Sequence, residues 1–204
     1  RDSAISFQNL KPFDRKSWVD VLERIDPAEQ LSKVDEYNVQ NALMNNAEWV
    51  TGSKEEFFSH RPLMNTFYTT KADLLQVDVK DFFLSVNPVF QFQLGKETDT
   101  DEKIFQNTKG AKVRGLIAKK IGFDFYLTDS QERPPYFVRQ FEDSFHAVPG
   151  AGFYKSFKKT AYDYFDARGS VFFNVTKYIN VQFGYDKNFI GDGYRSLFLS
   201  DFGT

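Results

Sequence analysis

Residues 82–94 read FFLSVNPVFQFQL, and this stretch decides the expected fold. Apolar side chains and one proline occupy its even positions: Phe82, Leu84, Val86, Pro88, Phe90, Phe92 and Leu94. Polar side chains occupy most of its odd positions: Ser85, Asn87, Gln91 and Gln93. Alternation with a period of two is the pattern of a β-strand that has one apolar and one polar face. We therefore expect a long strand here.

The same period recurs in four later stretches, at residues 108–118, 121–128, 161–173 and 179–186. One face of these stretches is apolar, and six of its residues are Phe123, Phe125, Phe165, Val171, Val181 and Phe183. The opposite face holds charged residues in mid-strand: Lys112, Arg114, Asp166 and Arg168. In a soluble β-sandwich or a lipocalin-like barrel that charged face meets bulk water, whereas in a large membrane barrel it lines a wet lumen. The alternation leaves both architectures open.

The expected connections alternate in length. Tight turns are expected near Lys119 and Lys177, and long connections at about 95–107 and 129–160. Outer-membrane barrels have short periplasmic turns and long external loops. The pattern predicts successive antiparallel neighbours and favours the membrane barrel. In that architecture lipid covers the six apolar side chains, so they should be exposed in the isolated chain.

Residues 13–60 carry helical signals instead. Three capping boxes are expected, at residues 17–20, 32–35 and 53–56, because each begins with serine and ends with an acid. Residues at helical spacing follow the first two boxes: an apolar face of Trp18, Leu22 and Ile25, then a stripe of Val34, Tyr37, Asn41 and Met44. The sequence thus predicts an N-terminal helical region over residues 1–70 and β-structure over residues 71–204.

Composition excludes several classes of function. The 204 residues contain 26 basic and 28 acidic side chains, which gives no electrostatic reason to expect nucleic acid. Cysteine is absent and there are two histidines, so thiol catalysis and Cys- or His-rich metal sites are not expected. Aromatic residues make up 18% of the chain, yet the mean hydropathy is −0.48. No apolar run approaches the length of about 18 residues that a membrane-spanning helix needs.

Motifs of catalysis are likewise absent. The sequence has no Gly-x-Ser-x-Gly, His-Glu-x-x-His or Walker pattern, so we expect neither an enzyme nor a cofactor. Glu97, Asp99, Asp101 and Glu102 form an acidic loop whose spacing matches no EF-hand, and a solvated loop is the expectation. Gly150 and Gly152 lie outside any strand–helix nucleotide loop and are interpreted as a hinge.

Two stretches resemble a known family. Residues 119–135 (KKIGFDFYLTDSQERPP) and 183–201 (FGYDKNFIGDGYRSLFLSD) are similar to Wzi-like capsule-assembly proteins of Bacteroidetes, in the branch that includes the RemB-like gliding-motility proteins. The resemblance covers about residues 77–204.

The resemblance implies an antiparallel transmembrane β-barrel in the bacterial outer membrane, with a helical region on its periplasmic side. Its partners would be membrane lipid and surface polysaccharide, which the protein binds or organises. We expect only the first five or six strands of a larger barrel in this sequence. The alternative is a structural subunit of an outer-membrane machine for motility, secretion or barrel assembly, with other outer-membrane proteins as partners. An outer-membrane enzyme is a third class that no motif supports.

Two segments supply the candidate polysaccharide-binding residues. The long connection contains Arg133, Tyr136 and Tyr154. Residues 186–196 contribute Asp186, Lys187, Asn188, Asp192, Tyr194 and Arg195. Tyrosine rings can stack on sugar rings, and the arginine guanidinium suits a bidentate contact with a sugar carboxylate. Arg195 and Tyr136 are the leading candidates. The structural alternatives are a lid folded over the lumen for the first segment and a glycine-containing turn for the second.

Overall fold

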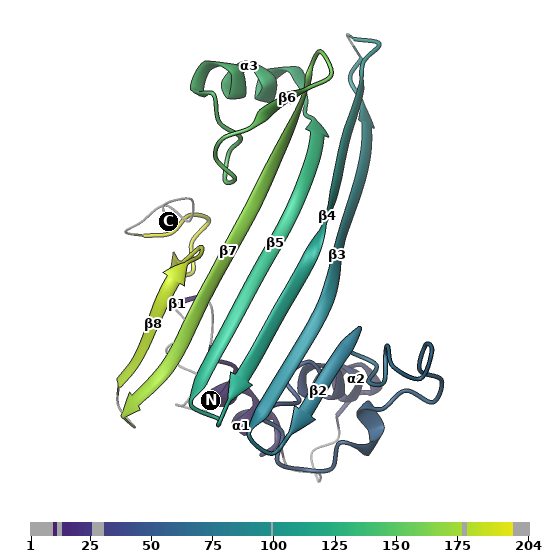
Figure 1. Cartoon of the computed structure of the whole chain (residues 1–204), viewed down its shortest axis with the longest axis vertical. Helices are drawn as coiled ribbons and strands as arrows, with labels where there is room; N and C mark the ends of the chain where they lie inside the picture. The colour runs from purple at the N-terminus through teal and green to yellow at the C-terminus, as the bar shows by residue number, and fades with distance from the viewer. Residues whose placement is uncertain (1–9, 12–13, 26–30, 99, 177–178, 198–204) are drawn as a thin grey trace. The chain divides into compact units, whose positions relative to one another are not determined.

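The computed structural model describes residues 10–11, 14–25, 31–98, 100–176 and 179–197. The chain divides into two compact units. One comprises the described parts of 1–85, 116–119 and 188–201, and the other those of 86–115 and 120–187. Most of the second unit is antiparallel β-sheet, whereas the first contains two of the helices (Figure 1).

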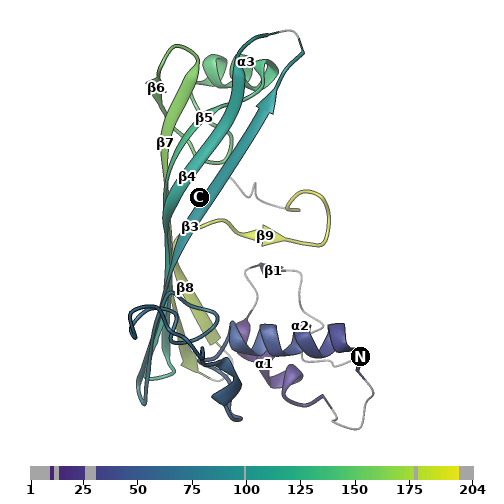
Figure 2. The ribbon, with the colours of Figure 1, turned by 90° about the vertical axis from the view of Figure 1, so that its right-hand side faces the viewer.

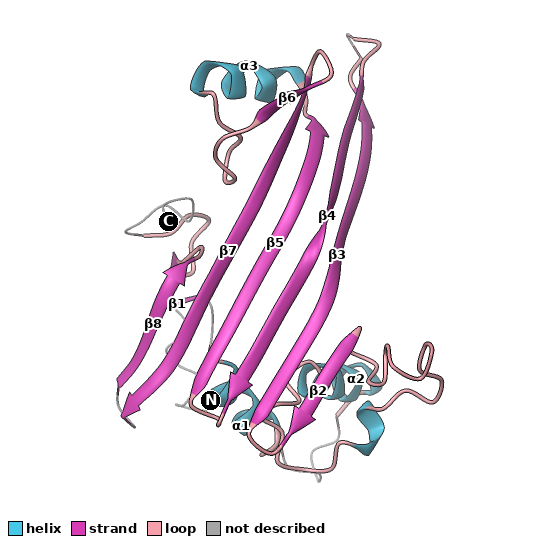
Figure 3. Ribbon diagram, in the orientation of Figure 1, coloured by secondary structure: helices cyan, strands magenta, loops and turns pink. Residues whose placement is uncertain are grey.

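The main sheet has seven strands in the order β2-β3-β4-β5-β7-β6, and β8 also pairs with β7 (Figure 3). Their bounds are β2 Leu75–Val79, β3 Phe82–Lys96, β4 Lys103–Ile117, β5 Ile121–Arg133, β6 Lys155–Phe157, β7 Ala161–Thr176 and β8 Ile179–Tyr185. The described strands do not close into a ring. The main sheet has more strands than the five or six expected, because the short strands β2 and β6 were not predicted.

The turn between β4 and β5 is tight, as predicted. Ala118 and Lys119 have φ of 51° and 54°, the left-handed region found in two-residue hairpin turns. The predicted turn at Lys177 lies outside the described residues. Strands β7 and β8 are antiparallel neighbours, and Thr176 pairs with Ile179.

Register assigns every side chain of β5, β7 and β8 to a face. On one face Phe123 pairs with Val171, which in turn pairs with Phe183. On the other face Asp124 pairs with Ser170, and Ser130 with Tyr164. These faces are the apolar and polar faces predicted from the alternation.

Glycines make room for aromatic rings on the apolar face. A Cβ on Gly115 would collide with the Phe123 ring, and a Cβ on Gly169 would collide with the Phe125 ring. Large rings covering glycine shield the exposed backbone of a strand and help to fix its register. The two glycines are therefore packing positions for the phenylalanines of β5.

The long connections differ from expectation. The link between β3 and β4 is only residues 97–102, because both strands extend further than their apolar alternation does. The link from β5 to β7 is long, but it contains helix α3, Tyr136–Phe145, and strand β6. Gly150 and Gly152, with φ of 79° and 93°, form a tight turn closed by the bridge between Val148 and Gly152.

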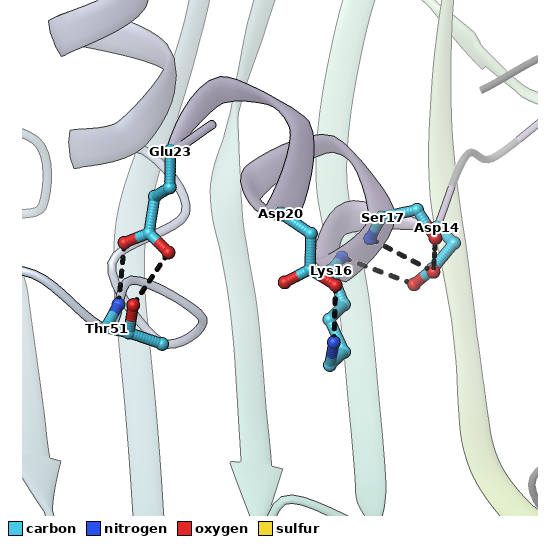
Figure 4. A network of polar contacts seen from close by, with 6 residues as sticks. All are labelled: Asp14, Lys16, Ser17, Asp20, Glu23 and Thr51. Carbon is cyan, nitrogen blue, oxygen red and sulfur yellow. Dashed lines mark hydrogen bonds and ion pairs between the residues drawn. The ribbon is translucent and has the colours of Figure 1, made fainter. Parts of the chain in front are cut away.

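Helix α1, Arg15–Leu22, begins one turn earlier than predicted. Its N-cap is Asp14, whose carboxylate accepts hydrogen bonds from the backbone N–H groups of Lys16 and Ser17 (Figure 4). The expected capping box at residues 17–20 is therefore wrong. Asp20 instead forms an ion pair with Lys16 at 2.6 Å. The fully buried residue of α1 is Val19, while the predicted Trp18 and Leu22 are half-buried.

Beyond α1, the Glu23 carboxylate binds the segment that follows the second helix (Figure 4). It accepts hydrogen bonds from the Thr51 backbone N–H at 2.7 Å and from the Thr51 hydroxyl at 2.8 Å. Partial burial opposes ionisation of Glu23, but these bonds and one from Gly52 outweigh it and lower the pKa of the carboxyl group. The carboxylate therefore ties the end of α1 to residues 51–52.

Helix α2, Lys33–Met44, confirms the serine half of the second capping box. Its N-cap Ser32 accepts a hydrogen bond from the Asp35 backbone N–H at 3.2 Å. The predicted apolar face is wrong, because Val34 and Tyr37 are exposed and no residue of α2 is buried. The third box forms only a 3-10 turn, Glu55–Phe57, preceded by Lys54 rather than serine.

A second sheet pairs β1, Leu10–Lys11, with β9, Phe189–Ile190. No helix of the described residues has the length and hydrophobicity that crossing a bilayer would need.

We expect Gly110→Ala to lower the free energy of unfolding by about 1–3 kcal/mol, because overpacking strains backbone that cannot move freely. A Cβ at Gly110 would collide with the backbone carbonyl oxygen of Leu127. Gly95→Ala is the matched control, since the new Cβ would meet Ile104 at an ordinary 3.4 Å. Denaturant unfolding in detergent, followed by circular dichroism, measures both. Equal losses would contradict this packing.

Candidate functional site

Helix α3 lies at the end of the sheet where β5 ends and β7 begins (Figure 1, Figure 2). Pro134 and Pro135 precede it, and Pro135 is its N-cap residue. The helix ends at His146, whose φ of 51° is the left-handed conformation common after helices. Its two buried side chains, Arg139 and Glu142, are charged, whereas Phe137, Phe141 and Phe145 are exposed. The helix thus presents its charged face to the sheet.

The acidic loop between β3 and β4 holds α3 in place. Glu102 accepts a 2.6 Å hydrogen bond from the Arg139 guanidinium and a 2.8 Å bond from the Thr160 hydroxyl. Glu97 accepts a bond from the backbone N–H of Tyr136 at 2.9 Å, at the first turn of the helix. The bonds from Thr160 and Arg139 lower the pKa of Glu102. The described residues contain no group of three acidic or histidine side chains that could hold a metal ion.

Three tyrosine hydroxyl groups bond to acidic side chains at this end of the sheet. The Tyr162 hydroxyl donates to Asp143 of α3 at 2.8 Å, and the Tyr154 hydroxyl donates to the same carboxylate oxygen at 3.4 Å. The rings of Tyr154 and Tyr162 meet edge to face, with centroids 4.4 Å apart. Tyr164 lies two residues after Tyr162 on the same face of β7, and its hydroxyl donates to Glu132 of β5 at 3.2 Å. We call the following six residues the acid–tyrosine cluster: Glu132, Glu142, Asp143, Tyr154, Tyr162 and Tyr164.

Glu142 is the unusual member of the acid–tyrosine cluster. Its side chain is 1% exposed, and neither carboxyl oxygen has a hydrogen-bond partner. Burial, and then the negative charges of Glu132 and Asp143, raise its pKa to about 7. An unpaired buried carboxylate is strongly unfavourable, so the neutral acid is the form that suits this position.

The structure brings Arg133, Tyr136 and Tyr154 to this end of the sheet. Arg133, the last residue of β5, donates to the Lys103 carbonyl at 3.2 Å and lies over the Phe105 ring. The Tyr136 hydroxyl accepts a bond from Gln140, and the Arg139 guanidinium lies 5.6 Å from its ring. All three side chains thus take part in contacts that hold the fold, although the Tyr136 ring remains exposed.

The other six predicted residues belong to the segment after β8. The backbone N–H of Lys187 bonds to the Asp186 carboxylate at 2.8 Å, and Asn188 is half-buried. Residues 191–196 form a turn closed onto β9, where Leu197 N–H donates to the Ile190 carbonyl at 2.9 Å. Gly191 has φ of 100°, as the turn interpretation expects. Asp192, Tyr194 and Arg195 are exposed on this turn.

Sequence reasoning missed the acid–tyrosine cluster apart from Tyr154. Its residues lie at ordinary spacings along the chain, and only the pairing of Glu132 with Tyr162 across β5 and β7 brings them together. The one usable signal is the repeat of Phe137, Phe141 and Phe145 at intervals of four, which predicts a helix within the long connection.

Comparison of the chain with protein-family models, with curated proteins and with solved structures gives no match.

We expect Arg139→Ala to raise the chymotrypsin cleavage rate within α3 about 10-fold, because loss of a charged hydrogen bond costs about 1–3 kcal/mol. The exposed Phe137, Phe141 and Phe145 provide the cleavage sites. Slow cleavage of a rapidly reclosing helix reports its opening equilibrium. Gln140→Ala on the same helix removes only an exposed hydrogen bond to Tyr136, so it should leave the rate within about 2-fold. Equal rates for Arg139→Ala and Gln140→Ala would show that the Glu102 contact does not hold α3.

Proposed function

We propose that this protein is an outer-membrane β-barrel protein that binds or organises surface polysaccharide. The observation that carries the proposal is the inverted arrangement of the long strands, with apolar side chains open and polar side chains buried. The resemblance of residues 119–135 and 183–201 to the capsule-assembly family supports the same assignment.

On several strands, the apolar side chains are far more exposed than the polar side chains of the opposite face. Phe90 of β3 and Phe183 of β8 are each 80% exposed. On the opposite face, Thr128 of β5 and Ser170 of β7 are 2% and 1% exposed. Single exposed apolar residues are ordinary in soluble proteins, but a contiguous apolar face marks a surface that something covers. Of the six residues expected on the apolar face, Phe125, Phe165 and Phe183 are exposed, and Phe123, Val171 and Val181 are half-buried by their neighbours.

The polar face is internally paired in the manner of a barrel lumen. Lys112 lies 3.7 Å from Asp124, and Arg168 lies 3.1 Å from Asp166. Arg168 also lies over the Tyr126 ring, at 4.4 Å. Charges with strand neighbours of opposite sign suit a wet interior.

The apolar band has an end. Along β5 it runs through Phe125 and Leu127, and the next positions on this face are Asp129 and Gln131. Asp129 pairs with Lys109 at 3.4 Å, and Gln131 bonds to Asp163 at 3.0 Å. The change from phenylalanine to charged pairs is what the edge of a hydrocarbon layer would require of a strand.

The polysaccharide part of the proposal assigns recognition to the turn after β9. Tyr194 is 97% exposed and Arg195 adjoins it, so one ring and one guanidinium are open to a ligand. An arginine binds carboxylates in two-point contacts, and a tyrosine ring offers an apolar platform with a hydroxyl. This combination suits an acidic glycan. Arg133, Tyr136 and Tyr154 contribute less, because the fold already uses them.

The outward row of Phe137, Phe141 and Phe145 favours a second function. A stripe of exposed aromatics on one helix resembles the anchors of protein interfaces. A structural subunit of an outer-membrane machine would use such a surface to dock another protein.

We expect Phe183→Arg to lower the folded fraction in lipid bilayers strongly, because arginine on a lipid-facing strand costs roughly 2–4 kcal/mol near the midplane. Gln182→Arg is the matched control: Gln182 is also exposed and adjacent in β8, but lies on the polar face. Gel-shift or protease-protection folding assays in vesicles measure both variants. Equal, small losses would favour a soluble sheet with both faces in water.

We expect the double variant Tyr194→Ala with Arg195→Ala to weaken binding of purified acidic capsular polysaccharide roughly 10-fold, which corresponds to about 1.4 kcal/mol. Tyr37→Ala, an exposed tyrosine of α2, is the control and should bind like the wild type. Binding of the detergent-solubilised protein to immobilised polysaccharide gives the dissociation constants. Unchanged affinity in a folded double variant would favour the machine-subunit function.

A further inference from the structure

Glu142 occupies a position that suits only a neutral acid. Glu142 lies on the buried face of α3, and neither oxygen of its carboxyl group accepts a hydrogen bond from another residue. The Arg139 guanidinium, one turn earlier on the helix, is engaged by Glu102 at 2.6 Å. Among the described residues, no group of three His, Cys, Asp or Glu side chains could hold a metal ion. Protonation would neutralise this buried carboxyl group without a new hydrogen-bond donor.

Apart from Arg139, the polar groups named around Glu142 are negative or neutral. Glu132 faces it from β5, and Asp143 from α3 itself. Tyr162 of β7 and Tyr154 direct their hydroxyl groups at Asp143, and Tyr164 of β7 directs its hydroxyl at Glu132. These donors are thereby used on the neighbouring acids. Ionisation of Glu142 would place a third carboxylate beside two others without supplying a new donor.

We propose that α3 is a proton-dependent latch, which closes over the ends of β5 and β7 when the Glu142 carboxyl group is protonated and opens when the proton leaves. The proton moves between the Glu142 carboxyl oxygen and solvent water, and no other bond changes. The inference goes beyond the proposed function and holds whether or not the strands cross a membrane, because every group in it belongs to α3, its flanking segments and the strand ends.

The direction of the pH response follows from the raised pKa. In the open helix the carboxyl group has its ordinary pKa of 4.5, and in the closed helix a pKa of about 7. Closure is therefore most favourable below about pH 4.5, weakens as the pH rises to about 7, and changes little above that. The Glu102 carboxyl group has a lowered pKa, so its contribution is lost only as the pH falls into the acid range. Glu102 therefore favours closure of α3 as the pH rises, opposite to Glu142, and its effect changes over a lower pH range.

Hydrogen exchange of the backbone amides in residues 136–146 tests the latch in the whole protein in detergent micelles. Rates are divided by the intrinsic exchange rates at each pH, so that they report the opening equilibrium of α3. From pH 5.5 to 8.5 we expect this equilibrium constant to rise roughly 30-fold in the wild type, as the shift between the two pKa values requires. Strand amides of β5 in the same sample serve as the internal control.

Variants separate the groups. Glu142→Gln keeps the shape without the charge change, so α3 should stay closed and its opening should become nearly independent of pH. Glu132→Gln removes one facing charge and should reduce the pH response without abolishing it. His146→Asn, at the C-cap of α3, controls for a change of side chain next to the helix. Wild-type opening that does not vary with pH would overturn the proposal, as would a full response in Glu142→Gln or loss of the response in His146→Asn.

Discussion

The hydrogen-bond register of β5, β7 and β8 is the constraint on which the rest of the second unit depends. Phe123, Val171 and Phe183 form one row across the three strands, and Asp124, Ser170 and Gly184 form the adjacent row on the opposite face. Because side chains alternate along a strand, a shift of one residue would exchange the two faces completely. Glycines reinforce the pairing. A side chain on Gly184 would meet Ser170 and the Gly169 carbonyl group, so the strands approach closely there.

The same register builds the acid–tyrosine cluster. Pairing of Glu132 with Tyr162 and of Ser130 with Tyr164 places both tyrosines on the polar face at the end of the strands. The Tyr162 hydroxyl then bonds to Asp143 of α3, and the buried face of the helix carries the charged Arg139 and Glu142. Its phenylalanines consequently point outward, so the helix is inverted in the same sense as the strands. One alternation along β5 and β7 thus determines both the open apolar band and the contacts of the helix.

Sequence patterns predicted the long strands and the hairpin turn at Lys119, because a period of two over seven or more residues leaves few alternatives. They failed where local signals compete. Asp14 caps α1 in place of the predicted Ser17, since both residue types are good N-caps and only the entering backbone decides between them. The exposed Val34 and Tyr37 of α2 show that a stripe at helical spacing does not prove burial. The buried Glu142 could not be predicted, because its neighbours come from β5, β7 and the residue 154 segment.

In the proposed outer-membrane barrel, the apolar face of the sheet meets lipid and the polar face meets water. The chain has no cysteine, so single cysteines at residues 179–185 of β8 can each carry one nitroxide label. Collision rates with oxygen, which concentrates in hydrocarbon, and with a water-soluble nickel complex then report the surroundings of each position in vesicles. The account predicts high oxygen and low nickel accessibility at Ile179, Val181 and Phe183, and the reverse at Asn180, Gln182 and Gly184. High nickel accessibility at all these positions, without alternation, would contradict it.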